Sequence, residues 1–93
     1  MNKSQLIKEV SNCTDFSQAI CEKIINSALD IITYELSRGN NVSLADFGVF
    51  TPKHRKKRVG RNPHTGERVP IPARTMPTFQ PGKKLKEVVI DGN

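Results

Sequence analysis

The stretch RVGRNPHTGERV, residues 58–69, decides the fold of this chain. Basic residues surround a Gly-Arg-Asn-Pro-His-Thr-Gly centre, and few of its side chains can join a core. Asn62 can hydrogen-bond its neighbouring backbone, Pro63 fixes its own φ, and Gly66 tolerates a positive φ, so residues 62–66 have the chemistry of a turn. Val59 and Val69 flank this turn roughly symmetrically. The pattern predicts a two-stranded ribbon that protrudes from the rest of the chain.

The charge of the chain is concentrated around this ribbon. Residues 1–45 carry four Lys or Arg against five Asp or Glu, whereas residues 46–93 carry eleven against four. Six cations fall within nine residues: Lys53, Arg55, Lys56, Lys57, Arg58 and Arg61. Cations packed so closely repel one another, so we interpret them as the footprint of a polyanionic partner. A solvated basic hairpin without a ligand is the alternative interpretation.

Two helices are predicted ahead of the ribbon. Asn2 and Gln5 form a capping-box pattern that opens a helix to about residue 12. Ser17 is placed to cap a second helix that runs to residue 37 or 38, with Phe16 packing on Cys21 as a hydrophobic staple. Gly39 then supplies a left-handed C-terminal cap.

Short strands and a last helix are predicted around the ribbon. Val42 and Leu44 alternate with polar residues, as in a strand with one buried face. Gly48, between Phe47 and Phe50, predicts a bulge or a bend. A return strand is expected over residues 76–79, and KKLKEVVI, residues 83–90, predicts a helix with Leu85, Val88 and Val89 facing inward. The fold class is therefore α+β, a helical body and a small antiparallel sheet extended into a long β-ribbon arm, plus a short C-terminal helix.

The length of 93 residues predicts one domain, with a body at 1–52 and 75–93 and an arm at 53–74. The first residues lack the pattern of a signal peptide, and no apolar run is long enough to span a membrane, so a cytoplasmic protein is expected. Cys13 and Cys21 lie eight apart, and both histidines, His54 and His64, fall in the basic segment. We expect no metal, no cofactor, no small-molecule substrate and no enzymatic activity.

The second helix has a wider apolar surface than one short helix can cover. Its apolar residues follow two neighbouring rows: Ile20, Ile24, Ala28 and Ile31, and Ile25, Leu29, Ile32 and Leu36. A second copy of the chain is the simplest cover, which predicts a dimer.

The ribbon has the side chains to bind double-stranded DNA. Arg and Lys can neutralise phosphates and enter an electronegative minor groove. Pro63, rigid and apolar at the tip, can wedge between stacked bases and bend the duplex. Residues 53–74 contain no Phe, Tyr or Trp on which unpaired bases could stack, which argues against a single-strand or RNA platform.

The sequence resembles the bacterial histone-like HU and integration host factor family over nearly its whole length. The resemblance rests on the opening MNKSQLI, on Phe47-Gly48-x-Phe50, on the motif Gly60-Arg61-Asn62-Pro63-x-Thr65-Gly66, on Ile71-Pro72-Ala73-Arg74 and on Pro81-Gly82-Lys83. One departure is Asp46, where family members often have a small residue. Its carboxylate could cap a turn, pair with a cation or repel DNA.

The resemblance implies an intertwined dimer with two ribbon arms around double-stranded DNA. Pro63 would be the intercalating tip, with Arg58, Arg61 and Asn62 lining the groove beside it. The arms would be lined by Lys53, Arg55, Lys56, Lys57, Arg68 and Arg74. Lys3, Lys83, Lys84 and Lys86 would contact the DNA flanks, and Phe47, Phe50 and Phe79 would form core.

The sequence thus predicts a DNA-architectural protein of a bacterium or bacteriophage, associated with the nucleoid. An HU-like homodimer with low sequence specificity is favoured over an integration-host-factor-like subunit of a heterodimer with site preference. From another class, a small basic RNA- or ribosome-associated protein is the competing hypothesis.

Overall fold

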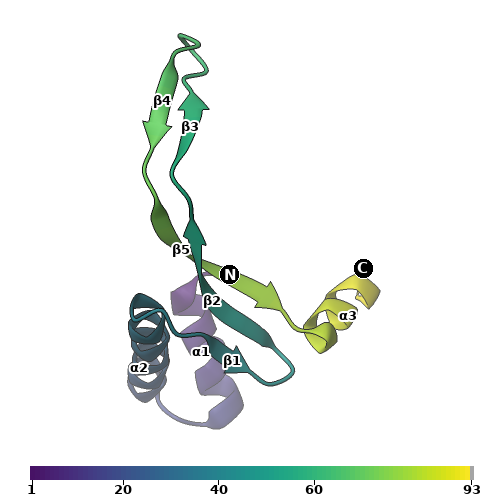
Figure 1. The fold of residues 1–93 in the computed structure, drawn as a ribbon. Helices are drawn as coiled ribbons and strands as arrows, with labels where there is room; N and C mark the ends of the chain where they lie inside the picture. Colours follow the sequence, from purple (N-terminus) through teal and green to yellow (C-terminus); the bar gives the residue numbers. More distant parts are fainter. Residues whose placement is uncertain (93) are drawn as a thin grey trace. The chain divides into compact units, whose positions relative to one another are not determined.

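The computed structural model describes residues 1–92, which form two compact units, Met1–Tyr34 and the chain from Glu35 onward. The elements in chain order (Figure 1) are α1 (Lys3–Thr14), α2 (Gln18–Ser37), β1 (Val42–Leu44), β2 (Gly48–Arg55), β3 (Arg58–Arg61), β4 (Arg68–Ile71), β5 (Arg74–Pro81) and α3 (Lys83–Asp91). The α+β class with an antiparallel ribbon and a C-terminal helix is confirmed.

The predicted helix starts are confirmed by their hydrogen bonds. The Asn2 side chain accepts from the Gln5 N–H and the Gln5 side chain accepts from the Asn2 N–H, both at 2.9 Å. Ser17 Oγ accepts from the Ile20 N–H at 3.2 Å, as the N-cap of α2. Helix α1 runs to Thr14, beyond the predicted end. It stops where Asp15 takes a left-handed conformation, φ 63°, and donates its N–H to the Ser11 carbonyl.

The end of α2 has the predicted glycine cap. Gly39 is left-handed, with φ 82°, and its N–H donates to the Leu36 carbonyl at 3.1 Å. The next N–H, of Asn40, donates to the Glu35 carbonyl at 2.9 Å. These two bonds are the Schellman pattern, which satisfies carbonyls that a helix end leaves without partners.

The sheet has the strand order β1-β2-β5, all antiparallel. Pairing of β2 with β5 is unbroken from Gly48↔Pro81 to Arg55↔Arg74, so a bulge at Gly48 is wrong. The alternative, a bend, is found just before it, because Asp46 and Phe47 lie in a turn. Gly48 is required by close packing instead: a Cβ there would lie 2.6 Å from the Phe79 ring.

Three phenylalanines cluster on this sheet and its turn. The Phe79 ring lies 4.9 Å from that of Phe50 and 5.5 Å from that of Phe47, centroid to centroid. They contact one another as expected of core residues, yet Phe47 is 47% exposed and Phe79 38% exposed in the single chain. The inward placement of Val88 and Val89 is wrong, since these side chains of α3 are 63% and 56% exposed. Both side chains are thus largely exposed in the part of the single chain that the structure describes.

Asp46 occupies a left-handed position in the turn before β2. Its φ is 65°, and the next N–H, of Phe47, donates to the Leu44 carbonyl at 3.0 Å. A residue with a Cβ is strained in this conformation by about 1 kcal/mol, whereas glycine is not.

We therefore expect Asp46→Gly to raise the free energy of unfolding by up to about 1 kcal/mol, measured by urea denaturation. Asp46→Ala is the control, because it removes the carboxylate and keeps the Cβ. Equal stabilisation by both changes would show that the charge, and not the backbone conformation, is unfavourable at this position.

Candidate nucleic-acid interface

The tip of the ribbon is a turn closed by its own hydrogen bonds. The Asn62 N–H donates to the Glu67 carbonyl and the Gly66 N–H donates to the Asn62 carbonyl, both at 2.8 Å. The Asn62 side-chain oxygen accepts from the His64 N–H at 2.9 Å, and Gly66 has φ 73°. The predicted turn chemistry is confirmed. It leaves Pro63 exposed at the tip of an internally bonded loop.

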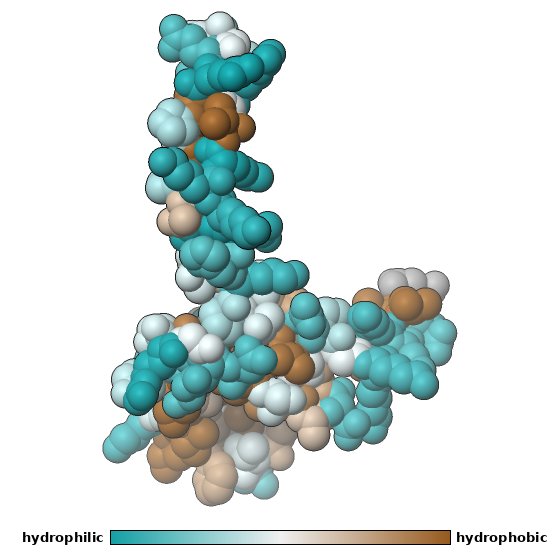
Figure 2. Space-filling view, viewed as in Figure 1, coloured by the Kyte–Doolittle hydropathy of each residue, from teal (hydrophilic) through white to brown (hydrophobic). Residues whose placement is uncertain are grey.

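The register of the ribbon differs by one residue from the symmetric arrangement of the two valines. Strand β3 pairs with β4 so that Val59 stands opposite Pro70 and Gly60 opposite Val69. Val59 and Val69 therefore lie on opposite faces of the ribbon. The side chain of Ile71 packs over Gly60, where a Cβ would lie 2.7 Å from the Ile71 Cδ1 atom. Figure 2 shows one strongly apolar patch on the otherwise mainly hydrophilic ribbon.

Two pairs of arginines stand directly opposite each other across the strands. Arg55 faces Arg74 at the end of the β2–β5 ladder, and Arg61 faces Arg68 next to the tip. Like charges in directly opposed positions destabilise a ladder. Residues 53–74 carry eight Lys or Arg and one acid, Glu67, so the sequence supplies too few carboxylates to neutralise them. An external anion would stabilise this arrangement.

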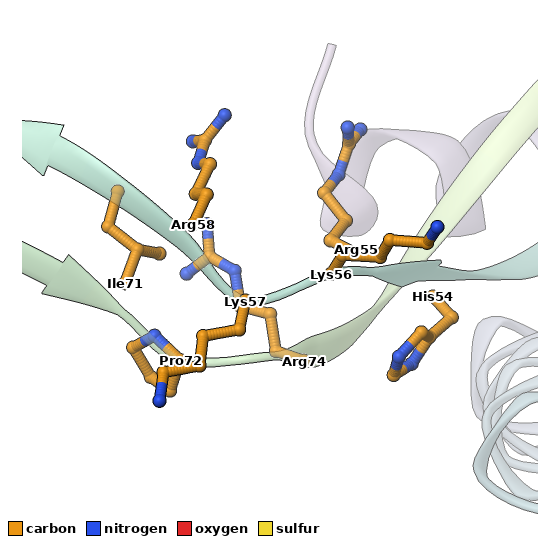
Figure 3. A pocket seen from close by; sticks show the side chains of 8 residues that line it. All are labelled: His54, Arg55, Lys56, Lys57, Arg58, Ile71, Pro72 and Arg74. Atoms are coloured by element: carbon orange, nitrogen blue, oxygen red, sulfur yellow. The ribbon is translucent and has the colours of Figure 1, made fainter.

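An open hollow of about 340 Å³ lies between the two arginine pairs, where the β2–β5 ladder gives way to β3–β4. Figure 3 shows the residues that line it: His54, Arg55, Lys56, Lys57, Arg58, Ile71, Pro72 and Arg74. Arg55 and Arg58 project to one side of the ribbon, and Lys57 and Pro72 to the other. The lining is mainly cationic, which suits a negatively charged ligand.

The remaining predicted contacts lie outside the ribbon. Lys83, Lys84 and Lys86 are in the first turn of α3, whose N-cap, Gly82, has no capping side chain. Cations are unfavourable at this positive end of a helix unless an anion is nearby. Lys3 is the first residue of α1, in the compact unit Met1–Tyr34.

The described residues contain no group of His, Cys, Asp and Glu that could hold a metal ion. Among the same residues, no helix has the length and apolar character to cross a membrane.

Comparison with known proteins decides the family. A family model described as bacterial DNA-binding protein matches residues 1–90. The chain belongs to this family of bacterial DNA-binding proteins. Among its relatives, HU-beta of Serratia marcescens is 42% identical over 96% of this chain and 99% of its own length. HU of Geobacillus stearothermophilus is 43% identical over 96% and 99% of the two chains.

Solved structures of the family have the same fold. An Anabaena HU from a cocrystal structure with DNA superposes with a TM-score of 0.89 at 37% identity, over 96% of this chain and 97% of that one. HU from Thermotoga maritima gives a TM-score of 0.68 at 28% identity, over 96% and 98% of the chains. The family is a structural one without enzymatic activity, in agreement with the sequence. Its DNA-binding, histone-like character confirms the predicted resemblance to HU.

Proposed function

We propose that this HU-type protein binds double-stranded DNA through the minor groove and bends it by insertion of Pro63, with low sequence specificity. The observation that supports this most directly is that arginines face each other across the strands at two positions, Arg55 opposite Arg74 and Arg61 opposite Arg68. They place guanidinium groups along both strands of the ribbon, where these long side chains can reach into a groove. Phosphates on both sides of the groove would supply the missing negative charge.

The ribbon has few groups that could distinguish base pairs. Asn62 is its only Asn or Gln side chain, and the oxygen of that amide already accepts the His64 N–H. Arginine and amide side chains distinguish individual base pairs in the major groove, whereas the minor groove, in which the arms are proposed to bind, mainly distinguishes A·T from G·C pairs. Binding would therefore depend on charge and on how easily the duplex deforms.

The proposed contacts follow from these positions. Pro63 has no N–H to leave unsatisfied, and architectural proteins of the minor groove insert such apolar wedges between base steps. The full proposed DNA-binding set is Lys3, Lys53, Arg55, Lys56, Lys57, Arg58, Arg61, Asn62, Pro63, Arg68, Arg74, Lys83, Lys84 and Lys86.

We further propose that the chain acts as a homodimer and that residues 1–93 form one domain, with an arm at 53–74. Among the hydrophobic side chains of the described part of the chain, only Ile7 and Cys21 are buried. Leu29, Phe47 and Phe79 remain half-exposed, so a second copy is needed to complete a core. A heterodimer with a related chain is the alternative. Binding to the bacterial chromosome or to a bacteriophage genome would place the protein in the nucleoid.

The test uses the purified chain and a duplex labelled at both ends, with and without a central nick, over a salt series. We expect the logarithm of the binding constant to fall with the logarithm of the salt concentration, with a slope of about −0.9 for each phosphate neutralised. Binding should bring the duplex ends closer together, and the nicked duplex should bind more tightly than the intact one. Binding without bending would favour a missing second subunit. Preference for RNA of equal length would support the ribosome-associated alternative and contradict the proposal.

A further inference from the structure

Four prolines in the strands, Pro52, Pro70, Pro77 and Pro81, and Pro72 between β4 and β5 place conflicting demands on the hydrogen-bond ladder. Antiparallel partners alternate between pairs that exchange two backbone hydrogen bonds and pairs that exchange none. Proline has no N–H, so it fits only the second kind, called the non-bonded pair below. The positions of the prolines therefore determine which pairs along each ladder can be bonded.

In the β2–β5 ladder the prolines agree with one another. Pro52 stands opposite Pro77, and Pro81 stands opposite Gly48. Both pairs must be non-bonded, and they are four residues apart, so the alternation accommodates both. The bonded pairs of this ladder then include Arg55↔Arg74.

In the β3–β4 ladder the alternation of bonded and non-bonded pairs is inverted, meaning shifted by one pair relative to a continuation of the β2–β5 alternation. Pro70 stands opposite Val59, so that pair is non-bonded, and the bonded pairs are Arg58↔Ile71 and Gly60↔Val69. The bond from the Asn62 N–H to the Glu67 carbonyl, 2.8 Å, continues the same series toward the tip. Arg55 and Arg58 are three residues apart, yet both belong to bonded pairs.

The two ladders meet at an interruption of two residues in each strand, Lys56-Lys57 and Pro72-Ala73. Neither strand has an insertion, because the partner numbering is the same on both sides of the interruption. If the β2–β5 pattern continued, Pro72 and Pro70 would both fall in bonded pairs, opposite Lys57 and Val59. Both prolines lack the N–H that those pairs need.

The inversion changes the direction in which Arg58 points. Along a two-stranded ribbon of L-residues, all bonded pairs carry their side chains on one face and all non-bonded pairs carry them on the other. Arg58 is thereby brought to the face of Arg55 and Arg74. Figure 3 agrees, since Arg55 and Arg58 project to the same side. In an uninterrupted ladder Arg58 would point to the opposite face.

We propose that Pro70 and Pro72 are positioning residues for DNA binding, which invert the pairing and gather three guanidinium groups on one face to bind DNA phosphates. This inference rests on the function proposed above. The two prolines need not touch DNA. Their effect is transmitted through the backbone to Arg58, beside the hollow that the interruption opens.

The pairing is tested by NMR on the full chain and on the Pro70→Val/Pro72→Val variant, since close cross-strand Hα–Hα contacts mark non-bonded pairs. We expect such a contact between residues 59 and 70 in the native chain. In the variant it should be replaced by contacts between 58 and 71 and between 60 and 69. The control, Pro77→Val/Pro81→Val, keeps Pro52 and should keep the native pattern. A native pattern in the first variant would overturn the proposal.

DNA binding by the same three proteins tests the role of the inversion. In the Pro70→Val/Pro72→Val variant the salt slope should become less negative by about 0.9, the loss of one phosphate contact, while the control keeps the native slope. If the pairing changes but the salt slope does not, the two prolines do not position Arg58 for DNA binding. The inversion of the pairing would still stand. If the native chain fails to bind duplex DNA, the proposed function is wrong. The DNA-binding role of these prolines is then wrong as well, even if NMR shows the inverted pairing.

Discussion

Replacing Leu29 with Lys in α2 is expected to abolish the dimer and the cooperative unfolding transition. Leu29 is 47% exposed in the single chain, although it lies on the same row as the half-buried Ile25, Ile32 and Leu36. If a second copy covers this row, the substitution buries an ammonium group without a partner. That costs about 3 kcal/mol or more in each chain, a large part of the stability of a small domain.

Sedimentation and thermal unfolding at several protein concentrations measure this effect. The native chain should sediment as a dimer, with a Tm that rises with concentration. Asp30→Lys introduces the same side chain one residue away, at an exposed position outside both apolar rows of α2, and should alter stability by less than about 0.5 kcal/mol. If Leu29→Lys is equally harmless, Leu29 is a surface residue of a monomer.

The parts of the fold that sequence could predict are those set by local chemistry. The capping box of Asn2 and Gln5, the left-handed Gly39 and the turn at Asn62 and Gly66 are each specified within a few residues. Such contacts depend little on the rest of the chain, so single-sequence reasoning finds them. The family motif around Pro63 belongs to the same local class.

The errors concern contacts between distant residues. The position of the Phe79 ring over Gly48 could not be read from the local pattern, which gave only a bulge or a bend. The register of the ribbon depends on a turn that separates Asn62 from Glu67 by four residues, and it moves Val69 opposite Gly60. Val88 and Val89 form an apolar row on α3, but both side chains are more than half exposed among the described residues of the single chain.

The candidate site was predictable in composition but not in orientation. The charge clusters around Arg55 and Arg58, so these residues could be chosen from sequence, whereas the face to which each points depends on the pairing pattern. The spacing of the prolines contained that information. Pro52 and Pro77 require one alternation and Pro70 the opposite one, but this conflict is visible only when the register is known.

Replacing Pro63 with Ala is expected to remove most of the bend while reducing affinity much less. The wedge provides little of the electrostatic attraction, which comes from the arm cations and their phosphates. In the proposed complex Pro63 holds a base step open, and its insertion offsets the few kcal/mol that unstacking costs. End-to-end energy transfer on a doubly labelled duplex measures the bend, and the same titration gives the affinity.

Two further variants separate insertion from a general change in the tip. Pro63→Leu keeps an apolar side chain that can enter between bases, so part of the bend should return. His64→Ala removes a neighbouring side chain but keeps the backbone N–H that donates to Asn62, and the bend should remain native. If Pro63→Ala bends DNA as well as the native chain does, bending arises from the charge along the arms and not from insertion at the tip.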